Sequence, residues 1–354
     1  MKKSLMIAGV VAVTGQLIGG LMPVRPAFAD DQLSVVSMGG RYQMAQRKAY
    51  FEPYAEQTGV KITEDEYLDE PAKVRAMVET KSVTWDVIVT DLSYAITLCN
   101  EGIIEPIDWK KIGLDRAKFM EGDKSDCGVP TDVYSEVVAY DKDKLPNGPE
   151  SIADLFDLQK FPGKRGLFKD PWGNLEWALM ADGVPIKDVY KVLRTPEGVD
   201  RAFKKLDTIK KDVVWFVSFA QPLQLLADGQ VVMTTSGNGR ISDANKNDGK
   251  HFAIMWDAQR LGVNVWAMPK GTSRLEDAHK FIAFAASPQA EANFSGNMPY
   301  GPANKDAVAL VDPAVLPDLP TAPENMANAM MMDLNFWADN GDALRQRFTA
   351  WLAK

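Results

Sequence analysis

Short apolar runs rich in β-branched residues alternate along most of the chain with longer stretches that have apolar residues at helical spacing. This alternation is typical of α/β proteins with largely parallel sheets, in which a helix connects one strand to the next. The runs that we expect to form strands are residues 33–37, 60–62, 86–90, 213–217, 231–235, 252–255 and 263–267. The pattern predicts helices over residues 41–58, 91–102 and 222–228.

Capping residues mark where these helices begin. A Ser, Thr or Asp side chain can accept a hydrogen bond from a free N–H of the first turn, and an acid three residues later strengthens the signal. The predicted N-caps are Asp69, Asp91, Ser151, Thr195, Ser273 and Ser287. Gly59 is the expected C-terminal stop of the first helix. A proline-rich stretch at 312–323 indicates a surface connection that precedes C-terminal helices.

The N-terminus has the pattern of a secretory signal peptide. Lys2 and Lys3 precede an apolar stretch at 5–22, and Ala27-Phe28-Ala29 supplies the small residues that a signal peptidase requires. Thr14 and Gln16 interrupt the apolar stretch, which argues against a membrane-spanning helix. We therefore expect cleavage after Ala29 and a soluble periplasmic protein. Cleavage would shift the formal net charge from −8 to −11, because residues 1–29 contain two lysines, one arginine and no acid.

This acidic balance and the chain length narrow the class of function. An acidic protein repels phosphate backbones, so we expect no nucleic-acid partner. About 325 mature residues exceed what one hydrophobic core usually supports, which favours two lobes. The two histidines, His251 and His279, lie in no metal-ligand spacing, and we predict no metal, no cofactor and no catalytic residue.

The two cysteines, Cys99 and Cys127, are expected to form a disulfide, because an even pair in an exported protein usually does. The alternative is an enzyme in which Cys127 is a free nucleophile beside a cleft. A thiol titration distinguishes the two cases.

Eleven short segments, in order, resemble spermidine/putrescine-type extracellular solute-binding proteins of ABC transporters. They are GGRYQMAQRK at 39–48, FEP at 51–53, TGV at 58–60, TWDV at 84–87, CGVP at 127–130, FPGKR at 161–165, LEWAL at 175–179, QLLADG at 224–229, NGR at 238–240, WAMPKG at 266–271 and YGPAN at 300–304. Together they extend over most of the mature chain.

The resemblance implies an α/β, two-lobed, type II periplasmic-binding-protein-like fold. Each lobe would be a mixed, largely parallel sheet flanked by helices, and the hinge would have two crossings, near residues 133–140 and 261–266. The implied bounds are 30–135 for the first part of lobe 1, 136–263 for lobe 2, 264–310 for the return to lobe 1, and 311–354 for C-terminal helices across lobe 2 and the hinge. The implied partners are a small-molecule solute and the permease subunits of the inner membrane, and the protein is expected to be a monomer.

The candidate ligand residues lie in loops that follow strands, since ligands of open α/β sheets bind beyond the carboxyl ends of the strands. These loops are 37–42, 90–94, 170–174 and 236–240. Together with residues that the resemblance implies, the candidates are Met38, Gly39, Gly40, Tyr42, Asp91, Asp132, Tyr134, Trp172, Asn238, Arg240, Asn264, Trp266 and Tyr300. Of these, Trp172, Trp266 and Tyr300 are the expected ring walls.

Three positions depart from the polyamine-binding pattern. Met38 replaces an aromatic residue, Gly237 replaces a tryptophan, and Asn264 replaces an acid. We expect Asp132 or Asp91 to supply the acid instead, although Asp91 is also predicted to cap a helix. Because Arg240 can grip a carboxylate, we predict a ligand with both charges, namely a γ-amino acid or an opine-like compound. A polyamine is the second reading, and a ferric ion, for which no Tyr-Tyr pair is present, is a distant third.

Overall fold

A computed structural model describes residues 32–67 and 71–354. The strands are β1 Gln32–Ser37, β2 Lys61–Glu66, β3 Val87–Asp91, β4 Val129–Asp141, β5 Arg165–Phe168, β6 Val213–Phe216, β7 Met233–Gly237, β8 Phe252–Ala267, β9 Gly301–Pro302 and β10 Met330–Met331. The α-helices are α1 Gly40–Gln46, α2 Glu52–Thr58, α3 Pro71–Glu79, α4 Leu92–Asn100, α5 Ile152–Phe156, α6 Asn174–Ala181, α7 Val189–Leu193, α8 Pro196–Asp207, α9 Pro222–Ala227, α10 Asn238–Asp248, α11 Leu275–Ala285, α12 Pro288–Asn297 and α13 Leu334–Leu352. A π-helical turn, Arg47–Phe51, joins α1 to α2.

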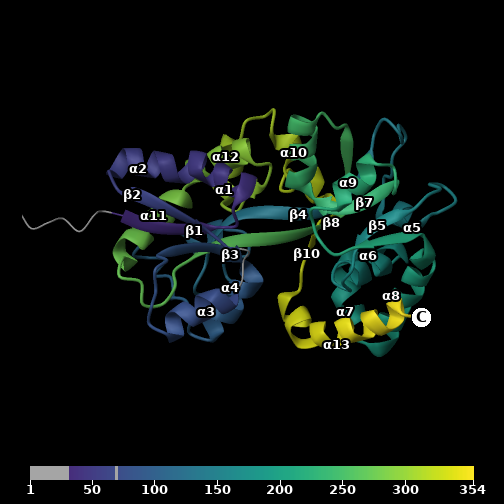
Figure 1. Cartoon of the computed structure of the whole chain (residues 1–354), viewed down its shortest axis with the longest axis horizontal. Coiled ribbons are helices and arrows are strands. Elements are labelled where there is room, and N and C mark those ends of the chain that lie inside the picture. Colours follow the sequence, from purple (N-terminus) through teal and green to yellow (C-terminus); the bar gives the residue numbers. More distant parts are fainter. Residues whose placement is uncertain (1–31, 68–70) are drawn as a thin grey trace, which may run out of the picture. The chain divides into compact units, whose positions relative to one another are not determined.

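One mixed sheet runs through these elements in the order β2-β1-β3-β8-β4-β7-β5-β6 (Figure 1). Strands β1, β2 and β3 are parallel and belong to the first lobe, and β5, β6 and β7 are parallel and belong to the second lobe. The long antiparallel strands β4 and β8 join the two groups and are the two crossings of the hinge. The predicted two-lobed α/β fold is confirmed. The residue bounds predicted for the lobes remain a prediction.

Each lobe has its own apolar core. In the first lobe, α1, α2, α11 and α12 pack around Tyr50, Phe281 and Phe294, which are fully buried. In the second lobe, Phe336 and Phe348 of the C-terminal helix α13 pack into a core whose other members come mostly from residues 138–258. Strand β10, which precedes α13, pairs with β8 at the hinge.

Most of the predicted helix boundaries are correct. Gly59 ends α2 with a φ of 76°, in the left-handed region. Thr195 accepts a hydrogen bond from the N–H of Gly198 at 3.0 Å, and Ser287 accepts one from Ala290 at 3.4 Å. The capping box of Ser151 and Asp154 is also present. The predicted cap at Asp69 lies outside the described residues.

Two other predictions about elements were wrong. Ser273 does not cap α11: the helix begins after Arg274 without a side-chain cap. The two strands expected at 252–255 and 263–267 are one continuous strand, β8. The hinge crossing expected near residues 133–140 lies within β4, which already starts at Val129. In both hinge strands buried polar residues interrupt the apolar pattern, and several of them pair with one another across the strands, as Asp132 does with Asn264 and Glu136 with Arg260.

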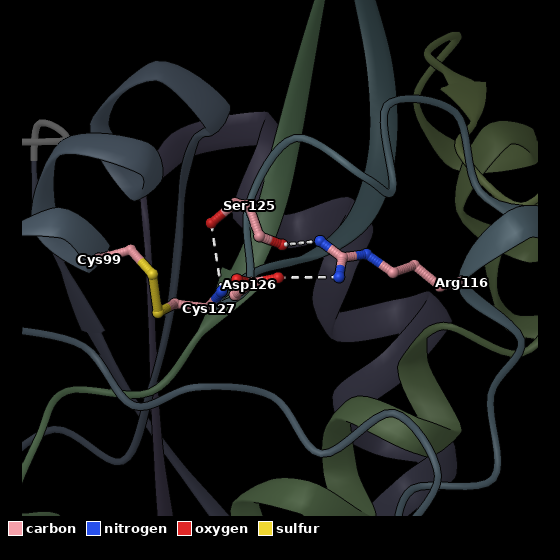
Figure 2. The surroundings of a disulfide bond; sticks show 5 residues. All are labelled: Cys99, Arg116, Ser125, Asp126 and Cys127. Atoms are coloured by element: carbon pink, nitrogen blue, oxygen red, sulfur yellow. Dashed lines mark hydrogen bonds and ion pairs between the residues drawn. A yellow bond between two sulfur atoms is a disulfide. The ribbon is translucent and has the colours of Figure 1, made fainter.

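The predicted disulfide between Cys99 and Cys127 is confirmed (Figure 2). It joins the end of α4 to the segment that leads into β4. The Ser125 hydroxyl accepts the N–H of Cys127 at 3.2 Å. The Arg116 guanidinium donates to the Ser125 carbonyl at 2.9 Å and to Asp126 at 2.8 Å. The nucleophile alternative for Cys127 is wrong for this state of the protein, because its sulfur is bonded to Cys99.

Within residues 32–67 and 71–354, no helix is both long and apolar enough to cross a membrane. The predicted signal peptide at 1–29 lies outside the described residues. No cluster of His, Cys, Asp or Glu with the geometry of a metal site occurs in the same part of the chain.

Candidate ligand-binding site

A cavity of about 690 Å³ is lined by the strand-end loops of the first lobe, the hinge strands and helices α9 and α10 of the second lobe. Nine of the thirteen predicted ligand residues line it: Met38, Gly39, Gly40, Tyr42, Asp91, Tyr134, Arg240, Asn264 and Tyr300. The other four, Asp132, Trp172, Asn238 and Trp266, do not.

The turn between β1 and α1 requires its two glycines. Gly39 and Gly40 have φ angles of 71° and 57°, which L side chains rarely adopt. A Cβ atom on Gly39 would also lie 2.5 Å from the Glu66 carboxylate. The side chain of Gln43 accepts the Gly39 N–H at 3.2 Å and holds the turn against the helix. This turn brings Met38 and Tyr42 to the cavity wall.

Asp132 lies behind the cavity wall and acts through two residues that line it. Its side chain is fully buried. One carboxylate oxygen accepts the Tyr42 hydroxyl at 2.5 Å, and the other accepts the Asn264 amide N–H at 2.9 Å. Asn264 is therefore held with its amide oxygen free to accept from a ligand. The expectation that Asp132 meets an ammonium group directly was wrong, because cross-strand pairing of Asp132 with Asn264 places the amide in front of the acid.

Asp91 is both a helix cap and a cavity residue. Its carboxylate accepts the N–H of Ser93 at 2.8 Å, which confirms the predicted cap of α4. Its other oxygen accepts the Tyr134 hydroxyl at 2.8 Å. The Tyr134 hydroxyl proton is thereby engaged, as is that of Tyr42, and both phenolic oxygens are left as acceptors.

Three tyrosine rings gather beside these acids. The ring of Tyr300 lies 5.9 Å from that of Tyr42 and 6.1 Å from that of Tyr134. We call Tyr42, Tyr134 and Tyr300, together with Asp91 and Asn264, the tyrosine pocket. Aromatic faces, a carboxylate and acceptor oxygens are the groups that attract an ammonium ion.

Burial perturbs the acid behind this pocket. It raises the pKa of Asp132 to about 7, against the opposing effect of the hydrogen bonds from Tyr42 and Asn264. Burial, with Asp132 nearby, also raises the pKa of Tyr300 to about 12, while the positive charge of Arg240 opposes that rise.

Helix α10 forms the opposite wall and is anchored by its first residue. Asn238 is fully buried, accepts the Ser135 N–H at 3.1 Å and donates to the Pro299 carbonyl at 2.5 Å. It therefore positions the helix and does not face the cavity. A Cβ atom on Gly239 would lie 2.7 Å from the Tyr300 ring, so glycine permits the close approach of α10 to the tyrosine pocket.

Arg240 supplies a cationic group at this wall. Its side chain is exposed and makes no hydrogen bond or ion pair with any residue that the structure describes. By contrast, Arg41 of the first lobe pairs with Asp243 of α10 at 2.8 Å. Arg240 is thus available to an anionic group in the cavity.

Two of the predicted ring walls were wrong. Trp266 is fully buried in the first core, where its ring packs 5.7 Å from Tyr50 and 5.4 Å from Phe281. The Trp172 ring lies 3.7 Å from the guanidinium of Arg260, which forms a buried ion pair with Glu136. Both indoles are used for packing.

The sequence reasoning also missed residues that line the cavity. Phe219, in the loop between β6 and α9, is 37% exposed and stacks on Phe168 with ring centroids 4.5 Å apart. This loop follows the carboxyl end of a parallel strand, so the rule that selected the other loops would have found it. Leu223, Lys250 and Phe252 line the cavity as well and have no such signal.

Three buried carboxyl groups give the fold an unusual pH dependence. Burial raises the pKa of Asp132 and of Glu176 to about 7, and raises that of Glu291 well above its usual value. The folded state therefore binds more protons than the unfolded chain between about pH 4 and 7, and the free energy of unfolding falls as pH rises through that interval. We expect a higher melting temperature at about pH 5.5 than at about pH 8.

Thermal unfolding across this interval, with Glu176→Gln as the comparison, measures the effect. The variant keeps an acceptor oxygen for the donors of Tyr190 and Trp337, and it loses the acceptor for the Gly173 N–H. Because it has no proton to lose, its stability should depend less on pH. Carboxylates with lowered pKa values, such as Glu64 and Asp154, act mainly below this interval. A native protein that becomes more stable from pH 5.5 to 8 would contradict the prediction.

Comparisons with known proteins place the chain among transport proteins. Residues 49–326 match the bacterial extracellular solute-binding protein family. The gamma-aminobutyric acid-binding protein of Pseudomonas aeruginosa is 46% identical over 336 residues, which are 95% of each chain. The putrescine-binding periplasmic protein of Escherichia coli is 22% identical over 84% of this chain and 85% of its own.

Solved structures agree in fold. The Atu4243 GABA receptor is 35% identical with a TM-score of 0.78, and covers 91% of this chain and 98% of its own. The binding protein MotA from A. tumefaciens B6, in complex with glucopine, is 34% identical with a TM-score of 0.77, over 91% and 99%. The resemblance to solute-binding proteins is confirmed, whereas its polyamine branch is only distantly related. The chain belongs to the bacterial extracellular solute-binding protein family.

Proposed function

We propose that this protein captures GABA, or a closely related γ-amino acid, in the periplasm and delivers it to the permease subunits of an ABC importer. One observation carries the proposal: a single cavity has a tyrosine pocket with a carboxylate on one side and the unpaired Arg240 on the other. A ligand that carries both an ammonium and a carboxylate group matches both sides.

The ammonium group of the ligand would lie in the tyrosine pocket. Asp91 provides a carboxylate, and Asn264 presents its amide oxygen because its N–H groups are turned to Asp132. The hydroxyl of Tyr42 already donates to the buried Asp132, and that of Tyr134 donates to Asp91, so both phenolic oxygens remain as acceptors for an ammonium group. The tyrosine rings add cation–π attraction.

The carboxylate of the ligand would face Arg240 and the start of α10. A guanidinium binds a carboxylate with two parallel hydrogen bonds, and the free N–H groups of the first helical turn favour an anion. Arg240 is the third residue of this helix, so both contributions act at the same end of the cavity. A polyamine is less suited, because its second ammonium group would face Arg240.

Binding is expected to favour closure of the two lobes. The tyrosine pocket belongs to the first lobe and the hinge, and Arg240 belongs to the second lobe, so one ligand contacts both. A ligand that binds better to the closed arrangement shifts the population toward it. The ion pair between Arg41 of α1 and Asp243 of α10 joins the lobes in the same arrangement.

The P. aeruginosa relative, whose name describes GABA binding, supports this ligand, and the glucopine-bound relative supports an opine-like compound as the second candidate. The role is capture and not catalysis, and we propose that the mature protein, cleaved after Ala29, acts as a monomer. Neither an added cofactor nor a metal is part of the proposal.

Titration calorimetry of the purified mature protein tests the proposal. We expect saturable binding of GABA at one site per chain, weaker binding of putrescine, and no binding of butyrate or butylamine, each of which carries only one of the two charged groups. Tight putrescine binding without a response to GABA would reverse the order of the candidates. Glucopine in the same series distinguishes the opine-like alternative.

A further inference from the structure

The cavity extends well beyond the space that GABA needs. Five of its residues, Gly239, Arg240, Asp243, Ala244 and Asp248, lie along α10 from near its first residue to its last. At a rise of 1.5 Å per residue, this wall is about 14 Å long. GABA has four bonds between its nitrogen and its carboxyl carbon, each about 1.5 Å, and is less than about 6 Å long.

Beyond Arg240 the cavity wall includes a group of apolar side chains beside the polar Gln224 and Asp243. Leu223 and Ala227 of α9 face Ala244 of α10 and Phe252 at the start of β8, and we call these four residues the distal groove. Ala244 and Phe252 are buried, and all four pack against a small core that includes Leu226, Val231 and Ile241. The walls are therefore part of a packed unit and exist before any ligand arrives.

The far end of the distal groove carries no net charge. Asp248 and Lys250 both line it, both are exposed, and they have opposite signs. Neither side chain has a hydrogen-bond or ion-pair partner among residues 32–67 and 71–354. A ligand segment in the groove is thus selected for apolar surface and not for charge.

We infer that the distal groove is a second subsite, which binds a neutral hydrocarbon substituent of a γ-amino acid. This inference rests on the proposed function: the ammonium group occupies the tyrosine pocket, the carboxylate binds Arg240, and the substituent continues along α10. Because the groove begins where Arg240 lies, the substituent is attached to the carbon next to the carboxylate. The preferred ligands are therefore larger and more apolar than GABA.

The test is a series of GABA analogues that carry unbranched alkyl groups of increasing length on that carbon. Each methylene that enters the groove should tighten binding about fourfold, until the groove is filled. Calorimetry measures the affinity of each analogue for the native protein and for Leu223→Gln, in which a polar side chain of similar size replaces an apolar wall. In this variant we expect the increase of affinity with chain length to disappear.

Leu225→Gln is the matched control. It introduces the same change two positions along α9, at a side chain that is not part of the cavity wall, and should leave the increase with chain length intact. If GABA binds the native protein but affinity falls as the alkyl group lengthens, the subsite is wrong and the proposed function stands. If neither GABA nor any analogue binds, both are overturned.

Discussion

Replacement of Arg240 by glutamine lowers the affinity for GABA by about 10- to 100-fold. The expected loss follows from the removal of a charge-assisted hydrogen bond, which contributes about 1.5–3 kcal/mol, from a site in which no other described residue has an unpaired guanidinium beside the tyrosine pocket. Glutamine retains a donor but has no charge, so part of the contact survives. Calorimetric titration of the variant with GABA measures the effect.

Lys246→Gln provides the comparison for this variant. Lys246 also lies on α10 and is exposed, but its side chain is not part of the wall of the ligand cavity. The two variants remove the same charge from the same helix, and only Arg240→Gln should change the affinity by more than about twofold. Equal losses of affinity in both variants would show that Arg240 acts through long-range electrostatics and not through a contact. The placement of the ligand carboxylate at Arg240 would then be wrong.

Removal of the disulfide, by Cys99→Ser together with Cys127→Ser, lowers the free energy of unfolding by about 3–4 kcal/mol. The two cysteines are 28 residues apart, and opening a loop of that length restores conformational freedom to the unfolded chain by about this amount. Urea unfolding of the oxidised native protein and of the double variant measures the difference.

The affinity for GABA serves as the internal control for the disulfide variant. Neither cysteine lines the cavity, and the Arg116 contacts to Ser125 and Asp126 hold the same segment without the sulfur bond. We expect the native and double-variant proteins to bind GABA equally well at a temperature where both are folded. A loss of affinity for GABA with an unchanged free energy of unfolding would mean that the disulfide positions the site and does not stabilise the fold.

Local signals in the sequence predicted the helices and strands of the two lobes, because the contacts behind these signals involve residues that are close together in the chain. The caps at Thr195 and Ser287 and the stop at Gly59 depend on hydrogen bonds or φ angles within a few residues. The predictions failed where contacts between residues that are distant in the sequence determine the structure. Strand β8 continues past a register shift between Met255 and Arg260, after which β4 pairs with it again, and no pattern within those residues shows that partner.

The same distinction between local and distant contacts explains which residues of the candidate site could be predicted. Loops at strand ends were found because parallel strands bring them together, and they supplied six of the nine predicted residues that line the cavity. Trp266 was misplaced because a tryptophan near a cleft and a tryptophan in a core look alike in sequence. The role of Asp132 depends on its register opposite Asn264, which only the paired strands reveal. The departures at Met38, Gly237 and Asn264 agree with the lower identity to the putrescine-binding protein, 22%, than to the GABA-binding protein, 46%.

The insertion of α13 into the second core has a consequence for how the chain acquires its structure. Phe336 and Phe348 complete a core whose other members begin near residue 138, and the first core awaits Phe281 and Phe294. A chain that emerges N-terminus first, from a ribosome or through a membrane, can therefore finish neither core until most of its length is free. Such high contact order slows folding. In an exported protein, slow folding keeps the polypeptide unfolded, and so able to pass through a membrane channel, until its C-terminal helix has crossed the membrane.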